Sequence, residues 1–365
     1  MILLSEYNAL WKAIIRPSRD TYNDSDLGPA KFRISGVPVY REDIDLINSR
    51  MQRLKCSWFH PDWHFESVEG NRTASPCVVY LHGNCSSRVE GLQAIPVLLP
   101  LHISLFVFDF AGSGQSDGDY VSLGYYEKED LATVLEYLRG SELVSRIGLW
   151  GRSMGAVTAL LHGDRDPSIA GMVIDSAFAD IRTLASDLAE ELGLRLPGIM
   201  LSVVLGMLRL SVRSKAHFDI FDLQPIAHVD RTYIPALFTA ARNDTFVNPR
   251  NTDALFEKYA GDKNMVKVDG NHNSTRPKFL MHSIAIFFIN TLGCEATVDA
   301  ILDLESLSPC GEERVNDGDE ESTRNEVRDL IPVPAPPPRR DHIKFGNDRL
   351  IDAGRGWVVG SDMKV

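Results

Sequence analysis

Short β-branched and aromatic runs alternate with helix-patterned stretches through the middle of the chain. The runs are CVVYLH (77–82), ISLFVFDF (103–110), RIGLW (146–150), AGMVID (170–175), IPALFTA (234–240) and NMVKVD (264–269). Helical spacing of apolar residues lies between them, at 128–139, 154–162, 251–259 and 279–292. Strands that alternate with helices predict βαβ units and a mostly parallel sheet. The runs are almost continuously apolar, which indicates helices on both faces of that sheet.

The flanks of this region divide the chain into three parts. We expect an extension over 1–44, an α/β domain over 45–293, and a tail over 295–365. Residues 45–66 predict an antiparallel strand or hairpin ahead of the first parallel strand. In the extension, apolar residues at helical spacing predict a short amphipathic helix: Leu3, Tyr7, Leu10, Trp11 and Ile14. The helix either packs on the main domain or touches a membrane surface, where Lys12 and Arg16 would meet lipid phosphates.

One interval is too long for a simple crossover between strands. Asp175 and Ile234 are separated by 58 residues, and the segment 192–210 within them is rich in Leu, Met and Val. We therefore predict an inserted helical cap over about 180–228. Its apolar helix is either an ordinary core helix or a lid over an apolar pocket, since an insertion this apolar has to cover something.

The tail over 295–365 has a different composition from the rest. It holds nine Lys and Arg against sixteen Asp and Glu, and it includes the run IPVPAPPPRR. Low apolar content with high acidity predicts disorder. The proline run is either solvated or adopts a polyproline II helix that docks on a partner.

Charge and cysteine content exclude several kinds of protein. The 365 residues carry a net charge of −12, whereas a nucleic-acid-binding protein needs a basic face. Five widely spaced cysteines form no CxxC pair, and Pro61 interrupts the HxxxH spacing of His60 and His64. We therefore expect no metal.

The N-terminus lacks a signal-peptide pattern, and no run of 18 apolar residues predicts a membrane span, so we expect a cytoplasmic protein.

The segment Gly151-Arg152-Ser153-Met154-Gly155 carries the first chemical signal. A G-x-S-x-G match alone is weak, but this one follows the strand RIGLW and precedes the helical stretch MGAVTALL. Strand, turn and helix are the context that a nucleophile elbow requires. The helix N-terminus there also favours developing negative charge. Ser153 is therefore the predicted nucleophile.

A serine hydroxyl needs a base, and the base needs a carboxylate. His272 follows the strand NMVKVD, and Asp244 follows the strand IPALFTA. Taken singly, His272 could be a surface or capping residue and Asp244 an Asx-turn residue. The ordered set Ser153, Asp244, His272, with each residue at a strand end, is far more specific. Asp175 is a second candidate for the acid.

Acyl transfer also needs two N–H donors for the oxyanion. One is the main-chain N–H of Met154, directly after the nucleophile. The other is predicted at Asn84 in the loop HGNC, with Cys85 as the alternative and His82 as a residue that braces the loop. The glycine-rich segment 109–118 fits neither GxGxxG nor a P-loop, so we assign it to bracing the site rather than binding phosphate.

Together, YLHGN, DFAGSGQSDGD, LWGRSMGA, ARNDTFV and DGNHN resemble the α/β-hydrolase superfamily. Within it, residues 45–293 resemble the serine aminopeptidase S33 (Hydrolase_4) domain, the Bem46-like hydrolases and the depalmitoylase-like ABHD17 hydrolases. The resemblance implies the α/β-hydrolase fold, no cofactor, and an esterase, thioesterase or peptidase that uses Ser153, Asp244 and His272. It departs from the depalmitoylases because the first cysteine is Cys56, which leaves no N-terminal cluster for lipidation.

The expected activity is acyl transfer to water from a small acyl, lipid-like or peptide substrate, and the apolar cap favours the acyl or lipid-like ones. An aminopeptidase would need an acidic group for the substrate ammonium, for which Glu190 and Glu191 are candidates. These two could equally be a solvated helix face. A protein of another class, a binding protein that works through its cap or tail, is the remaining alternative.

Overall fold

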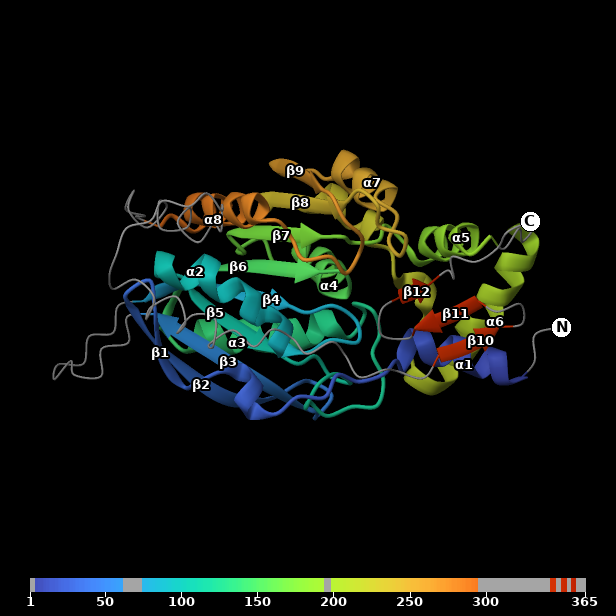
Figure 1. The fold of residues 1–365 in the computed structure, drawn as a ribbon, viewed down its shortest axis with the longest axis horizontal. Helices are drawn as coiled ribbons and strands as arrows, with labels where there is room; N and C mark the ends of the chain where they lie inside the picture. The colour runs from blue at the N-terminus through green and yellow to red at the C-terminus, as the bar shows by residue number, and fades with distance from the viewer. Residues whose placement is uncertain are drawn as a thin grey trace, which may run out of the picture.

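The computed structural model describes residues 4–61, 74–193 and 198–294, together with the backbone of three short strands near the C-terminus. A nine-stranded sheet has the order β1-β2-β3-β5-β4-β6-β7-β8-β9 (Figure 1). Its strands are β1 (Lys31–Ile34), β2 (Val37–Ile47), β3 (Arg53–Pro61), β4 (Ser75–Leu81), β5 (Ser104–Phe108), β6 (Val144–Arg152), β7 (Gly171–Asp175), β8 (Ala236–Ala241) and β9 (Lys263–Val268).

The six strands from β4 to β9 are parallel, as the apolar runs predict. Strands β1, β2 and β3 are antiparallel and join the sheet through β5. The prediction for this end was partly wrong, because the sheet begins at Lys31 rather than within 45–66. Two of the extra strands lie wholly or partly in the segment expected to be an extension. Their burial alternates, so they lack the unbroken apolar run that marks the parallel strands.

Helices cover both faces of the parallel strands. They are α2 (Ile95–Leu98), α3 (Glu127–Gly140), α4 (Met154–Gly163), α7 (Arg250–Lys258) and α8 (Lys278–Leu292). Side chains of α3, α4 and α7 join one core cluster, and those of α2 and α8 join the other. Strand β4 supplies both clusters alternately: Val79 faces the first, and Val78 and Tyr80 face the second. This confirms the predicted three-layer α/β architecture.

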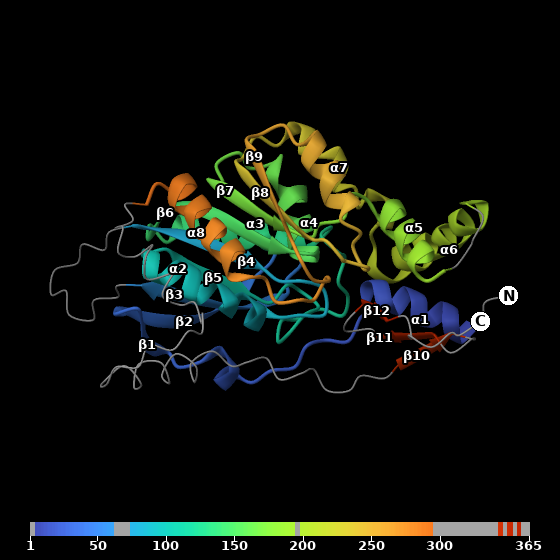
Figure 2. The same ribbon diagram turned by 45° about the horizontal axis from the view of Figure 1, so that its top comes forward.

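Two long helices are inserted between β7 and β8: α5 (Ile181–Glu191) and α6 (Gly198–Ala216). The N-terminal helix α1 (Leu4–Ile15) packs on α6, where the Tyr7 hydroxyl donates to the Met207 carbonyl at 2.8 Å. Figures 1 and 2 both place α1, α5 and α6 beyond the arrowhead ends of the parallel strands. The inserted helices therefore lie at the sheet edge where α/β proteins bind ligands.

Short 3-10 helices occupy several connections: η1 (Asp24–Leu27), η2 (Arg88–Ala94), η3 (Leu99–Leu101), η4 (Ile220–Asp222), η5 (Pro225–Ala227) and η6 (Val229–Arg231). The tail contains a three-stranded antiparallel sheet of β10 (His342–Phe345), β11 (Arg349–Asp352) and β12 (Gly356–Val358). The expectation of a tail without structure is wrong for these strands, which carry β-branched and aromatic residues. The proline run 331–338 lies outside the described residues.

Candidate active site

Ser153 lies on a strained turn between β6 and α4. Its φ and ψ are 51° and −114°, a conformation that non-glycine residues rarely adopt. A Cβ on Gly155 would lie 1.9 Å from the carbonyl oxygen of Leu81, and one on Gly151 would lie 2.4 Å from the carbonyl oxygen of Gly155. Glycine is therefore required at both flanking positions, and the steric reason for the G-x-S-x-G pattern is visible here.

The structure brings together the three side chains that the sequence predicts for the site. His272 Nε2 lies 3.0 Å from Ser153 Oγ, and His272 Nδ1 lies 2.6 Å from Asp244 Oδ2. An ionised carboxylate only accepts hydrogen bonds, so Nδ1 carries the proton and Nε2 faces the serine as an acceptor. All three residues are buried. This geometry can remove the serine proton.

Asp244 forms the contacts of an Asx turn and also faces His272. Its Oδ1 accepts hydrogen bonds from the main-chain N–H groups of Phe246 at 2.9 Å and Val247 at 2.8 Å, as in an Asx turn. Its Oδ2 faces His272. The Phe246 ring also packs against the imidazole, with the two ring centres 5.0 Å apart. The turn therefore fixes the carboxylate in the direction that the histidine requires.

Asp175, the second candidate for the acid, is committed elsewhere. Arg276 donates to both of its carboxylate oxygens, from Nε at 2.8 Å and from Nη2 at 2.9 Å. The same guanidinium donates to the carbonyls of Asn271 and Ser274, on either side of the turn that carries His272. Arg276 thus ties the histidine loop to the end of β7.

The two predicted oxyanion donors belong to different segments of the chain. Met154 is the first residue of α4, and Asn84 lies in the loop after β4. Within the described part of the chain, neither main-chain N–H donates to a protein acceptor. The N–H of Cys85, by contrast, donates to Asn84 Oδ1 at 3.0 Å. Among the candidates in this loop, the geometry favours Asn84.

A second ion pair near the serine is absent from the sequence prediction. Arg152 lies 3.4 Å from Glu90, and it donates to the main-chain carbonyl of His272 at 2.9 Å. Glu90 in turn accepts from the Gly83 N–H at 3.2 Å, next to Asn84. Burial opposes the ionisation of Glu90, but Arg152 and these hydrogen bonds outweigh it and hold its pKa below the ordinary value. Arg152 belongs to the G-x-S-x-G motif, so its position in the sequence could have pointed to this ion pair. No sequence pattern points to Glu90.

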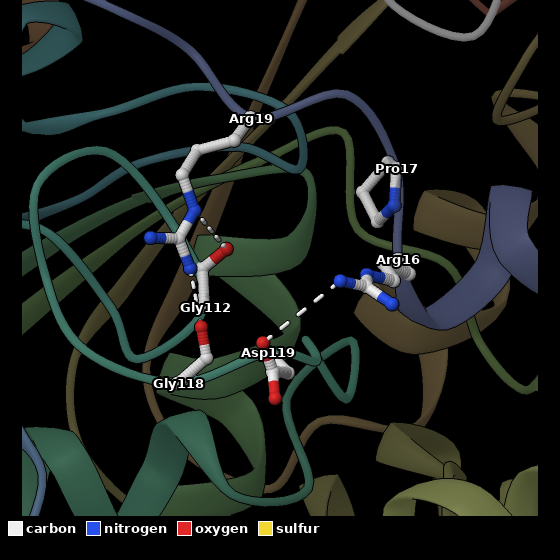
Figure 3. Close-up of a pocket in the computed structure, with 6 residues that line it drawn as sticks. All are labelled: Arg16, Pro17, Arg19, Gly112, Gly118 and Asp119. Carbon is white, nitrogen blue, oxygen red and sulfur yellow. Dashed lines mark hydrogen bonds and ion pairs between the residues drawn. The ribbon is translucent and has the colours of Figure 1, made fainter.

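The glycine-rich loop after β5 is held by hydrogen bonds within the chain, as a bracing role requires. Asp109 is buried and accepts from the N–H groups of Arg88 and Gln115. Arg19 donates to the carbonyls of Gly112 and Gly118 (Figure 3). Arg19, Gly112 and Gly118 line a surface cavity of about 250 Å³. The Arg19 guanidinium in this cavity is already hydrogen-bonded to the loop.

His82 braces the site as predicted. Its Nε2 accepts from the Phe110 N–H at 3.1 Å, so its Nδ1 donates to the Gly83 carbonyl at 2.8 Å. Both ring nitrogens are therefore used between two loops.

Residues 73–220 match the sequence model of the family described as serine aminopeptidase, S33. Solved structures with the same architecture include the esterase Pf2001 of Pyrococcus furiosus, with a TM-score of 0.57 and 20% identity over 77% of this chain and 99% of that one. The acetyl xylan esterase of Paenibacillus sp. R4 has a TM-score of 0.55 and 15% identity over 79% of this chain and 92% of that one.

The chain contains an α/β-hydrolase domain. Both the predicted superfamily and the predicted fold are thereby confirmed. The match to the serine aminopeptidase family covers residues 73–220, less than half of the chain, and it supports a hydrolase. Among relatives in sequence, YqkD of Bacillus subtilis is 28% identical over 62% of this chain and 76% of its own. A 31.7 kDa Escherichia coli protein from the traX–finO intergenic region is 32% identical over 32% of this chain and 42% of its own.

In the part of the chain that the structure describes, no helix is long and apolar enough to cross a membrane.

Proposed function

We propose that this hydrolase cleaves carboxylic esters or thioesters of acyl or lipid-like substrates through Ser153, His272 and Asp244. The observation that carries the proposal is the chain of two hydrogen bonds from Ser153 Oγ through His272 to Asp244. It starts at a serine held in the strained conformation of a nucleophile elbow. An acyl-transfer site needs this combination, and a buried polar cluster of purely structural value does not.

In the proposed reaction, His272 Nε2 takes the hydroxyl proton as Ser153 Oγ attacks the substrate carbonyl carbon. The tetrahedral oxyanion is stabilised by the main-chain N–H groups of Met154 and Asn84. The imidazolium, stabilised by Asp244, then gives its proton to the leaving oxygen or sulfur as the carbon–heteroatom bond breaks. Water, deprotonated by the same imidazole, then attacks the acyl carbon. The bond to Ser153 Oγ breaks, the imidazolium returns its proton to that oxygen, and the acid leaves.

Two observations favour an acyl substrate over a peptide. The inserted helix α6 carries Ile, Met, Val and Leu at the sheet edge that holds the serine. The candidate acids for a substrate ammonium are exposed to solvent: the Glu190 carboxylate lies 3.6 Å from Arg250, and Glu191 is exposed. The structural neighbours described as esterases agree with this choice.

The peptidase alternative is supported by the description of the matching family, serine aminopeptidase. A binding protein without catalysis is disfavoured, because such a protein has no need of the strained serine and its hydrogen-bonded base.

The test is labelling with a fluorophosphonate, followed by hydrolysis of p-nitrophenyl esters of increasing chain length. Ser153→Ala should abolish labelling. Asp244→Asn should lower kcat by about 10⁴, because the wrong imidazole tautomer then faces the serine. Ser202→Ala on α6 is the matched control and should retain both. Aminoacyl p-nitroanilides cleaved faster than any ester would instead establish the peptidase. Labelling that survives Ser153→Ala would overturn the assignment of the nucleophile.

A further inference from the structure

Helix α6 is apolar on two opposite faces, and only one of them is covered. Leu205, Leu208 and Val212 are buried in the main core cluster. On the other side, each of five apolar residues is at least 47% exposed: Ile199, Met200, Val203, Met207 and Leu210. A helix that is apolar all round is normally covered all round.

The five exposed residues form one continuous stripe. With about 100° of rotation per residue, their positions fall within an arc of about 100° along three turns of the helix. We call these five residues the α6 stripe. Exposed apolar residues scattered singly are normal, but a contiguous patch marks an interaction surface.

Charge around the α6 stripe is positive, although the whole chain carries −12. Helix α6 contains no acidic residue, and its last two turns carry Arg209, Arg213 and Lys215. Asp219 pairs with Arg209 and lies 3.9 Å from Arg213, so one carboxylate faces two guanidiniums. The Lys215 side-chain nitrogen lies 4.5 Å from the centre of the Trp11 ring. The stripe is thus bordered by a net positive charge.

We propose that the α6 stripe docks on the surface of an anionic lipid bilayer, with the helix lying in the plane of the interface. Interfacial helices combine an apolar face with flanking Lys and Arg, and their affinity rises with anionic lipid. The Tyr7 hydroxyl donates to the Met207 carbonyl and accepts from the Ser211 hydroxyl. These two bonds hold α6 against α1, so docking needs no rearrangement of the helix pair. Lys12 of α1 is exposed and adds a further cation.

Charge argues against one alternative occupant, a second copy paired in parallel, but not against the acidic tail of the same chain. A parallel two-fold pairing of α6 stripes would bring the basic C-terminal turns of both copies together, which like-charge repulsion disfavours. An antiparallel pairing would keep these turns apart, so the oligomeric state is measured beside vesicle binding. The acidic tail 295–365 would complement the cations, and it is therefore the competitor that the experiment has to distinguish.

The experiment is co-sedimentation of the full chain with vesicles of phosphatidylcholine containing about 30% phosphatidylserine, compared with vesicles of phosphatidylcholine alone. We expect binding to the anionic vesicles that weakens with added salt. The triple variant Ile199→Ser/Val203→Ser/Leu210→Ser should bind about tenfold or more weakly. Arg213→Gln/Lys215→Gln should lose the preference for phosphatidylserine.

The matched control is Met51→Ser/Tyr233→Ser/Phe279→Ser, which removes three equally exposed apolar residues away from α6. It should bind vesicles like the wild type. Equal binding by wild type and stripe variant overturns the proposal, as does a wild-type dimer that the stripe variant dissociates. Binding that occurs only after deletion of 295–365 would show that the tail occupies the stripe, and it also overturns the proposal. The readout is binding rather than turnover, so the result is independent of the proposed reaction.

Discussion

The ion pair between Arg276 and Asp175 offers a quantitative test of how the histidine loop is held. The two side chains are 4% and 5% exposed, and two charge-assisted hydrogen bonds of 2.8 and 2.9 Å join them. Arg276→Met leaves the carboxylate buried with only the Ser176 hydroxyl as a side-chain donor. Removing one partner of a buried pair costs about 3–5 kcal/mol. We expect the free energy of unfolding to fall by that amount.

The double variant Asp175→Asn/Arg276→Met separates the cost of losing the ion pair from the cost of leaving an unpaired carboxylate buried. It removes the uncompensated charge, so it should recover about 2 kcal/mol of the loss. The assay is urea unfolding at pH 7, with the midpoint and slope compared across variants. Arg242→Met is the matched control, because its ion pair with Asp269 is exposed and contributes at most about 1 kcal/mol. A single variant within about 1 kcal/mol of wild type, or a double variant less stable than the single, would refute the reasoning.

Three further predictions test the surroundings of the serine and the core. Glu90→Gln should lower kcat/KM for a p-nitrophenyl ester about tenfold, because it releases Arg152 from its carboxylate. The pKa of Glu90 is depressed in the folded protein, so the variant should also lose stability. This loss should be full above about pH 4.5 and should vanish as the pH falls through the folded-state pKa of Glu90. Gly155→Ala places a Cβ 1.9 Å from a main-chain oxygen and should cost about 3 kcal/mol or more in urea unfolding, whereas Gly206→Ala, with nothing within 4 Å, should gain up to about 1 kcal/mol. Burial raises the pKa of Cys77 to about 12, so Ellman's reagent at pH 8 should modify it only in the unfolded chain; reaction in the native protein would contradict this burial.

The sequence predicts the six parallel strands well. The five inner strands are buried over most of their length and are apolar there, whereas the edge strand β9 is only partly buried. The sequence also predicts which side chains meet at the site. Ser153, Asp244 and His272 each follow a strand directly, and the carboxyl ends of parallel strands share one edge. The structure places them within hydrogen-bond distance. Their catalytic roles remain the proposal above.

The sequence predicts the edge strands and the ion pairs poorly, for physical reasons. Strand β1 has four residues and lies at the sheet edge, so it needs only a weak apolar pattern. Arg276 and Asp175 are 101 positions apart, and their pairing follows from the strand order rather than from any local spacing. Glu90 belongs to a 3-10 helix whose sequence shows no periodicity.

The two ion pairs near the serine hold different segments of the chain in place. Arg152 links Glu90, which holds the loop after β4, to the His272 carbonyl, and Arg276 links the same histidine loop to β7. Neither arginine forms a hydrogen bond with the side chains of Ser153, His272 or Asp244, so both act on position rather than on proton transfer. The proposed chemistry therefore depends on groups fixed to the sheet. One face of α6 is buried in the core cluster shared with the parallel strands, whereas its exposed face is the stripe that we propose docks on a bilayer, so docking leaves the groups fixed to the sheet undisturbed.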